Sequence, residues 1–350
     1  MLNPGSKLDA IHSLNAPSFR LRLLTWYKTH GRQLPWRASR DPYHIWVSEI
    51  MLQQTRVFAV IEHYHEFLRR FPTVEKLAKA REGSVLAAWS GLGYYRRARM
   101  LHAAAKVVVQ EYGGKIPNTA EQLLALPGVG RYTAAAIASI AFGEPVAVVD
   151  GNVGRVLWRF LGKPLAGERL WQAANFLLDA RRPDDFNQAM MELGATVCTP
   201  RAPMCLTCPV IELCATRGDL KANKKSTPQK KREIHYALIC HGQSGRPDKI
   251  FLVQRPRDAS LMAGMWELPE TSKKDGSTEP ALMLRHSITV TDYTVRVWRR
   301  DSTEQLDGKW VLTSKLPSLA LTGLARKILR KAEILRNTFL KVRGSNKRFS

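Results

Sequence analysis

The sequence has little that would place the chain in a membrane or in an oxidising compartment. No stretch approaches the ~18 consecutive apolar residues that a membrane-spanning helix needs. The first 20 residues lack the apolar core and the small-residue cleavage site of a signal peptide. Only five of the 350 residues are cysteine. Without an oxidising compartment, we do not expect these cysteines to form disulfides.

Acidic residues are also few, with 30 Asp and Glu against 54 Lys and Arg, which gives a formal net charge of +24. Such a balance favours binding to a polyanion, because basic side chains release the counterions of nucleic acid and attract it at long range. A basic protein that is merely soluble is the alternative. The hydrophobic content of 45% is normal for a folded protein, and 350 residues suffice for two domains.

Four of the five cysteines lie in one short run. Cys198, Cys205, Cys208 and Cys214 are separated by six, two and five residues. In a reducing compartment such a cluster indicates metal or cluster ligands. Zinc ribbons have two separate C-x2-C pairs, whereas here only one pair has that spacing, so the pattern favours a [4Fe-4S] cluster over zinc. Cys240 stands alone, which is typical of a buried thiol.

The chain changes character along its length. Residues 18–216 predict one helix after another, because apolar residues recur at helical spacing between glycine and proline turns. Residues 217–233 contain seven basic and two acidic residues and form a predicted basic linker. Residues 234–345 have short β-branched and aromatic runs followed by a helical stretch, which predicts a smaller α+β domain.

A glycine-rich turn stands out within the helical part. In Leu126-Pro-Gly-Val-Gly-Arg-Tyr-Thr133, Gly128 and Gly130 precede an alanine-rich helix. Glycines let the backbone approach a phosphate closely, and the free N–H groups at a helix N-terminus favour an anion. A plain loop between helices is the alternative. The next element, Val146-Ala-Val-Val-Asp-Gly-Asn-Val153, places Asp150 where another helix is expected to begin.

Taken together, the glycine turn, the Val-Asp-Gly-Asn element and the four cysteines resemble the helix-hairpin-helix base-excision glycosylases of the endonuclease III superfamily. Three further motifs resemble its adenine DNA glycosylase (MutY) family: Gly31-Arg-Gln-Leu-Pro-Trp-Arg37, Trp46-Val-Ser-Glu-Ile-Met-Leu-Gln-Gln-Thr55 and Gly91-Leu-Gly-Tyr-Tyr95. The resemblance covers about residues 18–215. It implies a mainly α glycosylase domain with a [4Fe-4S] loop at residues 198–214.

Cleavage of an N-glycosidic bond needs a proton for the leaving base and a negative charge beside the cationic sugar, so two carboxyl groups in different environments suit it. Glu49 and Asp150 are the candidates. Glu49 lies in an apolar helix, where burial raises a carboxyl pKa, although most helical glutamates are simply exposed. Asp150 immediately precedes a helix, where aspartate is a common N-cap. The resemblance implies that Glu49 is the general acid and that Asp150 stabilises the sugar cation with support from Asn152.

Tyr132 separates two kinds of enzyme within the superfamily. Relatives with lyase activity carry a lysine at this hairpin position, whose amine forms a Schiff base. Since Tyr132 has no such amine, we expect a monofunctional glycosylase with Tyr132 packed near the catalytic carboxyls. A structural core tyrosine is the alternative.

A base inside duplex DNA must be flipped out before it can be cleaved. The resemblance implies intercalating and wedge roles for Gln54, Leu92 and Tyr94, a base-pocket or DNA-contacting segment at Arg32, Leu34, Trp36 and Arg37, and a further pocket acid at Glu192. Ordinary packing or surface placement is the alternative for each of them.

The C-terminal part, residues 234–345, resembles the family's Nudix-like lesion-recognition domain through Gln254-Arg-Pro256 and Gly264-Met-Trp-Glu-Leu-Pro269. It lacks the acidic helix that binds metal in active Nudix hydrolases. The family's His-x-Phe-Ser-His segment, which contacts 8-oxoguanine, is replaced by His286-Ser-Ile-Thr-Val290. Thr289 is expected to supply a hydroxyl there, but the opposite-base preference does not follow from the sequence.

The expected function is excision of adenine mispaired with 8-oxoguanine or guanine in double-stranded DNA by a monomeric enzyme that does not bind membranes. A bifunctional glycosylase/lyase for oxidised pyrimidines and a non-enzymatic DNA-binding relative are the alternatives. We expect a cytoplasmic, nucleoid-associated protein of a bacterial cell.

Overall fold

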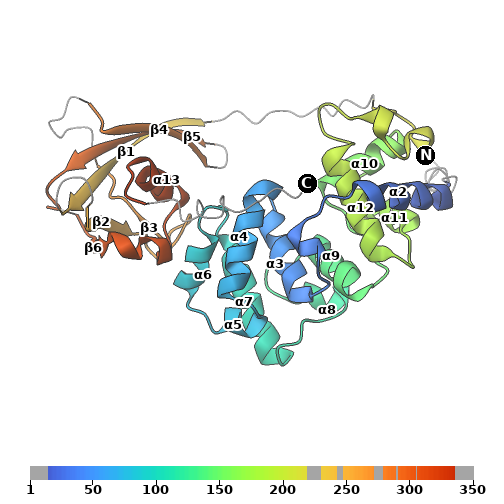
Figure 1. The fold of residues 1–350 in the computed structure, drawn as a ribbon, viewed down its shortest axis with the longest axis horizontal. Coiled ribbons are helices and arrows are strands. Elements are labelled where there is room, and N and C mark those ends of the chain that lie inside the picture. Colours follow the sequence, from blue (N-terminus) through green and yellow to red (C-terminus); the bar gives the residue numbers. More distant parts are fainter. Residues whose placement is uncertain are drawn as a thin grey trace, which may run out of the picture. The chain divides into compact units, whose positions relative to one another are not determined.

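The structure, a computed structural model, describes residues 15–218, 230–242, 247–271, 279–288, 291–304 and 306–335. Most of the predicted linker lies outside these residues. Contacts between residues divide the chain into two compact units (Figure 1). The first comprises Met1–Gln54, Thr73–Ala78 and Ala103–Asn223, and the second comprises Thr55–Pro72, Lys79–His102 and Lys224–Ser350. None of the described helices is long and apolar enough to cross a membrane.

The first unit is helical, as predicted. Its elements are α2 (Ala16–His30), η2 (Pro35–Arg37), α3 (Pro42–Leu52), α5 (Val74–Ala78), α8 (Ala120–Leu124), α9 (Arg131–Phe142), α10 (Gly151–Leu161), α11 (Glu168–Leu177), α12 (Pro183–Thr196), η3 (Cys205–Thr207) and η4 (Ile211–Leu213). Helix α7 (Arg96–Glu111) is divided between the two units.

Helix α9 lies at the centre of this unit and contacts α3, α8 and α12. Eight consecutive residues, Thr133 to Ile140, are buried, and five of them are Ala or Ser. Small side chains on every face let neighbouring helices approach from several sides. Buried Asn187 links α12 to α9 and to the segment that follows it. Its amide donates hydrogen bonds to Ser139 Oγ (2.9 Å) and to the carbonyl oxygen of Val146 (2.8 Å).

The second unit combines helices with a mixed sheet. It contains α4 (Val57–Arg70), α6 (Glu82–Trp89), β1 (Lys230–His241), β2 (Lys249–Gln254), β3 (Trp266–Glu267), β4 (Leu282–Ile288), β5 (Thr291–Arg300), β6 (Lys309–Leu312), η5 (Thr313–Ser318) and α13 (Gly323–Lys331). The unit thus takes in helices from within the predicted helical domain, residues 18–216. The domain boundaries at 217–233 stay a prediction.

The sheet has the strand order β3-β2-β1-β5-β4, with β6 also paired to β2. Strands β1 and β5 are parallel and the other pairs are antiparallel. Alternate residues of β1 and β5, namely Tyr236 and Leu238, and Val295 and Val297, pack in one core with the apolar side of α13. Figure 1 shows α13 beside the sheet. The predicted combination of a helical part with a smaller α+β part is therefore confirmed.

Candidate active site

Glu49 lies on α3, a helix in which eight of eleven residues are buried. The Glu49 side chain is only 5% exposed. The Tyr132 hydroxyl, on α9, donates a hydrogen bond of 2.6 Å to Glu49 Oε2. Burial raises the pKa of Glu49 to about 7; the Tyr132 hydrogen bond opposes the rise and the negative charge of Asp150 adds to it. At neutral pH a large fraction of Glu49 therefore keeps its proton, as a general acid requires.

Asp150 is the N-cap of α10. Its Oδ1 accepts hydrogen bonds from the backbone N–H groups of Asn152 (2.9 Å) and Val153 (2.7 Å), and its Oδ2 accepts one from Asn152 Nδ2 (2.9 Å). Burial raises the pKa of Asp150, but these hydrogen bonds stabilise the ionised form and oppose the rise. Asp150 thus has the capping role that its position predicts. It also lies close enough to Glu49 for the two carboxyls to interact electrostatically.

Tyr132 is half-buried beside both carboxyls. Besides its bond to Glu49, its hydroxyl lies 3.3 Å from Met191 Sδ. Burial raises the pKa of Tyr132 well above its ordinary value, and the charges of Glu49 and Asp150 add to this rise. The phenol therefore stays neutral and serves as a hydrogen-bond donor. The structure thus brings together Glu49, Asp150, Asn152 and Tyr132.

Glu192 is a second buried carboxyl, on α12, with no exposed surface. Arg32 donates to both of its oxygens, at 2.6 and 2.9 Å, and Arg37 donates to Oε2 at 2.8 Å. Burial alone would raise the pKa of Glu192, but the hydrogen bond from Arg32 and the charge of Arg37 lower it. The charge of Arg37 also lowers the pKa of Glu49. The Glu192 group therefore adjoins the Glu49 site.

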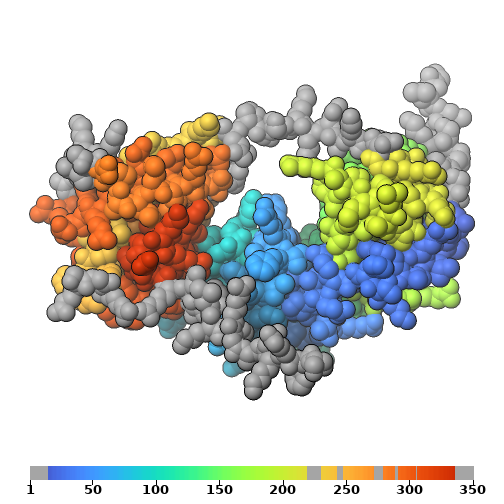
Figure 2. Space-filling view, turned by 45° about the horizontal axis from the view of Figure 1, so that its top comes forward, coloured from blue at the N-terminus to red at the C-terminus, as the bar shows by residue number. Residues whose placement is uncertain are grey.

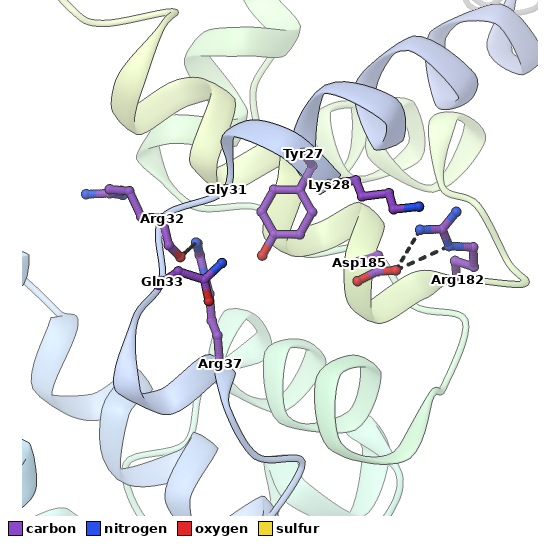
Figure 3. Close-up of a pocket in the computed structure, with 8 residues that line it drawn as sticks. All are labelled: Tyr27, Lys28, Gly31, Arg32, Gln33, Arg37, Arg182 and Asp185. Atoms are coloured by element: carbon purple, nitrogen blue, oxygen red, sulfur yellow. Dashed lines mark hydrogen bonds and ion pairs between the residues drawn. The ribbon is translucent and has the colours of Figure 1, made fainter. Parts of the chain in front are cut away.

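The two arginines also line a cavity of about 230 Å³. Figure 3 shows Tyr27 of α2 between Arg32, Gln33 and Arg37 on one side and the Arg182–Asp185 ion pair on the other. The remaining lining residues are Lys28 and Gly31. Neither Glu49 nor Asp150 lines this cavity, so it is distinct from the paired carboxyls.

The glycine turn connects α8 to α9 as a helix-hairpin-helix. Gly128 has a φ of +75°, a conformation that glycine adopts without strain. Gly130 is the N-cap of α9 and provides no side-chain hydrogen bond to the helix N-terminus. The first N–H groups of α9 are thus left for an external acceptor, which is the arrangement that favours a phosphate.

Two arginines of α10, which the sequence did not point to, join this site to the cysteine loop. Arg155 donates to Asn152 Oδ1 (2.8 Å) and to the carbonyl oxygen of Cys198 (2.8 Å). Buried Arg159 donates to the carbonyl oxygens of Thr199 (2.7 Å) and Pro200 (3.1 Å). The loop is therefore held by the same helix that Asp150 caps.

The cysteine loop is built from η3 and η4, and it lies beside α2, to which it is joined by an Arg22–Glu212 ion pair of 2.5 Å. Figure 2 shows this segment (yellow-green) at the surface next to α2 (dark blue). All five cysteines lie in the described residues, and none of them is in a disulfide there.

The four clustered thiols lie near one another. Burial raises the pKa of Cys208 to about 11, and the thiols of Cys198, Cys214 and Cys205 add to the rise. Four thiols without disulfides are the donor set that an iron-sulfur cluster takes. In the described part of the chain, however, no group of three or more His, Cys, Asp or Glu side chains is arranged to hold a metal ion.

The remaining predicted DNA-contacting residues have different surroundings. Gln54, with a φ of +54°, is exposed. Tyr94, with a φ of +47°, is 50% exposed. Leu92 is 6% exposed, so the alternative of ordinary packing describes it in this structure. Leu34 and Trp36 are also buried.

In the C-terminal sheet, His286 lies on β4, whereas Thr289 lies outside the described residues. The predicted role of Thr289 therefore stays a prediction.

The hairpin and the paired carboxyls define a class of protein. Residues 47–165 match the family model described as HhH-GPD superfamily base excision DNA repair protein. Two solved structures share the fold. A thermostable thymine-DNA glycosylase has a TM-score of 0.56 and 34% identity over 59% of this chain and 97% of that chain. Endonuclease III in a non-covalent DNA complex has a TM-score of 0.51 and 22% identity over 58% and 97%.

Curated relatives narrow the class to a family. The adenine DNA glycosylase of Mus musculus is 42% identical over 315 residues, which cover 73% of this chain and 61% of the mouse protein. That of Schizosaccharomyces pombe is 34% identical over 332 residues, covering 76% of this chain and 72% of the yeast protein. The chain therefore belongs to the adenine DNA glycosylase family. It spans about three fifths of the length of the mouse relative.

Gly194 on α12 allows the close crossing of α12 with α10. A Cβ atom at this position would lie 2.6 Å from Asn152 Cβ and 2.9 Å from its carbonyl oxygen. We expect Gly194→Ala to lower the free energy of unfolding by roughly 1–3 kcal/mol, because the backbone of Asn152 must move. Thermal unfolding measures this effect.

Gly83→Ala is the matched control, because Gly83 also lies in a helix but a Cβ there meets nothing within 4 Å. It should be neutral or stabilising. Equal stability of the Gly194→Ala variant and the wild type would contradict the predicted crowding at Asn152.

Proposed function

We propose that this protein removes adenine from DNA by hydrolysing its N-glycosidic bond. The observation that carries the proposal is the Glu49 carboxyl, buried, hydrogen-bonded by Tyr132 and with its pKa raised to about 7, near a second carboxyl, Asp150. A proton donor that works at neutral pH beside a second carboxyl whose ionised form accepts three hydrogen bonds is suited to this chemistry. Membership of the adenine DNA glycosylase family supports adenine as the base.

The proposed reaction begins with transfer of the Glu49 proton to a ring nitrogen of adenine. The bond from the sugar carbon to the base then breaks, and the electron pair leaves with the base. The ionised Asp150 carboxylate stabilises the positive charge left on the sugar. Water then adds to the sugar carbon, and Glu49, now ionised, takes a proton from that water. The products are free adenine and an abasic site.

We propose that the enzyme has no lyase activity. Tyr132, at the start of α9, offers a neutral phenol in the place where a lyase needs an amine. Without a Schiff base, the abasic strand stays intact until alkali cleaves it.

Double-stranded DNA is the proposed partner, with adenine paired to 8-oxoguanine or guanine and the enzyme acting as a monomer. The charge of +24 and the open N-terminus of α9 at Gly130 support binding to phosphate. Exposed Gln54 and Tyr94 are proposed to fill the space left by the flipped base. Arg32, Arg37 and Glu192 are proposed to line its pocket, and residues 234–345 are proposed to form a Nudix-like domain that contacts the opposite base.

We propose that Cys198, Cys205, Cys208 and Cys214 bind a [4Fe-4S] cluster. Their proximity and the absence of disulfides among them support the proposal. When bound, the cluster would have no open iron for substrate and would order the loop. That loop is fastened by Arg155 and Arg159 to the helix that Asp150 caps.

Excision of thymine is the second candidate, because the thermostable thymine-DNA glycosylase is 34% identical over 97% of its length. The test compares duplexes with adenine opposite 8-oxoguanine, adenine opposite guanine, and thymine opposite guanine. Strand cleavage is scored with and without alkali. Alkali-dependent cleavage at adenine supports the proposal, cleavage at thymine alone favours the second candidate, and cleavage without alkali indicates a lyase. Binding without cleavage would favour a non-enzymatic relative.

The same assay under single-turnover conditions gives a pH prediction. Since the protonated form of Glu49 acts as the acid, excision should fall as the pH rises through about 7. Tyr132→Phe removes the hydrogen bond that stabilises ionised Glu49, so the midpoint of this fall should move to higher pH. Glu49→Gln should lower the rate at least ~100-fold at every pH. An unchanged midpoint in Tyr132→Phe would show that another group sets the profile.

The cluster proposal predicts that Cys208→Ser lowers the iron and acid-labile sulfide content of protein purified without oxygen, because serine is a poor replacement for a soft thiolate ligand. Cys240→Ser is the control, since Cys240 lies on β1 outside the loop. It should retain the wild-type iron content. Wild-type protein free of iron after anaerobic purification would refute the cluster.

A further inference from the structure

Residues 90–95 of the second unit form a turn in an unusual backbone conformation. Gly91, Gly93 and Tyr94 have φ angles of +116°, +70° and +47°. Positive φ is ordinary for glycine but strained for tyrosine, and such strain persists only where the surroundings hold it. A side chain at Gly91 would require the His63 ring to shift, since its Cβ would lie 2.9 Å from His63 Nε2.

The middle of the turn, Leu92 and Gly93, is held by residues of the two flanking helices, α6 and α7. Arg97 Nη2 donates to the carbonyl oxygens of Leu92 and Gly93, both at 3.2 Å. Trp89 Nε1 donates to the carbonyl oxygen of Gly93 at 3.2 Å. The Arg97 guanidinium also lies 5.5 Å from the centre of the Tyr94 ring.

The two ends of the turn are held differently, by a single carbonyl that lies more than 220 residues away in the sequence. The Ser90 hydroxyl donates to the carbonyl oxygen of Leu321 at 2.9 Å, and the Tyr95 hydroxyl donates to the same oxygen at 3.4 Å. Ser90, Tyr95 and Leu321 are all buried. One acceptor therefore joins the beginning of the turn to its end.

Arg326, on α13, completes this arrangement. Its Nε donates to Ser90 Oγ at 2.8 Å. Burial lowers the pKa of Arg326 to about 10, so it remains a cation at neutral pH. Its Nη2 is buried and has no hydrogen-bond partner in the described part of the chain.

Leu321 is itself fixed to the C-terminal sheet. The Trp266 N–H donates to the carbonyl oxygen of Ala320 at 2.8 Å, and the Thr322 N–H donates to the carbonyl oxygen of Trp266 at 2.9 Å. Trp266 belongs to β3, which pairs with β2. An unbroken series of hydrogen bonds thus runs from the edge of the sheet to the two ends of the turn.

We propose that Ser90 and Arg326 are positioning residues through which the C-terminal sheet holds the Leu92–Tyr94 turn in the conformation that enters DNA. The inference rests on the proposed function, because it takes Tyr94 as a residue inserted during base flipping. The hydrogen bonds to the Leu321 carbonyl fix the separation of Ser90 and Tyr95, and so keep Tyr94 in its left-handed conformation with half of its surface exposed. The sheet and the inserted turn then act as one body on the DNA.

Amide hydrogen exchange of the peptide 89–97 in the full-length protein without DNA tests the proposal. Loss of a buried hydrogen bond should accelerate exchange in this peptide about tenfold in Ser90→Ala and in Arg326→Met, without a matching change elsewhere. Arg326→Lys keeps a donor and should exchange nearly as the wild type does. Arg99→Gln is the matched control, because the Arg99 side chain also bonds a C-terminal carbonyl, that of Ala263, while its Nε bonds Glu82 on α6.

Fluorescence of 2-aminopurine placed at the target adenine position provides a second readout. Emission from the flipped base should fall in Ser90→Ala and Arg326→Met, while DNA affinity changes little. If Ser90→Ala does not fold, Arg326→Met alone decides the result. Wild-type exchange of residues 89–97 in a folded variant, or equal acceleration in Arg99→Gln, would overturn the proposal. If the variants show these exchange differences but the wild-type protein excises no adenine, only the proposed function is refuted.

Discussion

Glu49 carries an ionisable carboxyl on a helix that is buried almost from end to end. The properties of the rest of the site depend on the burial of this carboxyl. A carboxylate transferred from water to such a place is strongly destabilised, so the group responds by holding its proton more tightly. The Tyr132 hydroxyl limits the effect because it stabilises the ionised form through a 2.6 Å hydrogen bond. The resulting pKa of about 7 lets Glu49 donate a proton and later accept one at the same pH. Stronger burial would leave a poor donor, and greater exposure would leave no proton to donate.

Asp150 illustrates how one side chain meets a structural and a chemical requirement together. Its hydrogen bonds to Asn152 and Val153 cap α10, and the same bonds oppose the rise in pKa that burial causes at this half-buried carboxyl. The cap also fixes where α10 begins, which in turn places Arg155 between Asn152 and the cysteine loop. The capping role and the proposed catalytic role are therefore compatible, since a carboxylate that accepts three hydrogen bonds is both a good cap and a stable anion.

The parts of this site that depend on local sequence could be predicted, whereas those that depend on long-range pairing could not. The apolar neighbours of Glu49 favoured its burial, with exposure left as the alternative, and the position of Asp150 before a helix indicated a cap. By contrast, Arg32 and Glu192 are 160 residues apart, and nothing in either segment indicates that one neutralises the other. The burial of Leu92 likewise follows from packing in the folded chain and has no local signal.

The net charge of +24 has one effect at long range and another in direct contact, and different groups are responsible for each. At long range every cation contributes to the field that attracts a polyanion, even an arginine bonded to carbonyl groups, because a carbonyl does not neutralise charge. At contact range, several arginines are already engaged: Arg159 and Arg155 hold the cysteine loop, and Arg32 and Arg37 bind Glu192. The proposed contact with phosphate therefore involves other groups than these four arginines, such as the uncapped N–H groups of α9 after Gly130. The formal charge thus supports the proposed binding of DNA, and the glycine turn provides the backbone N–H groups proposed to contact its phosphates.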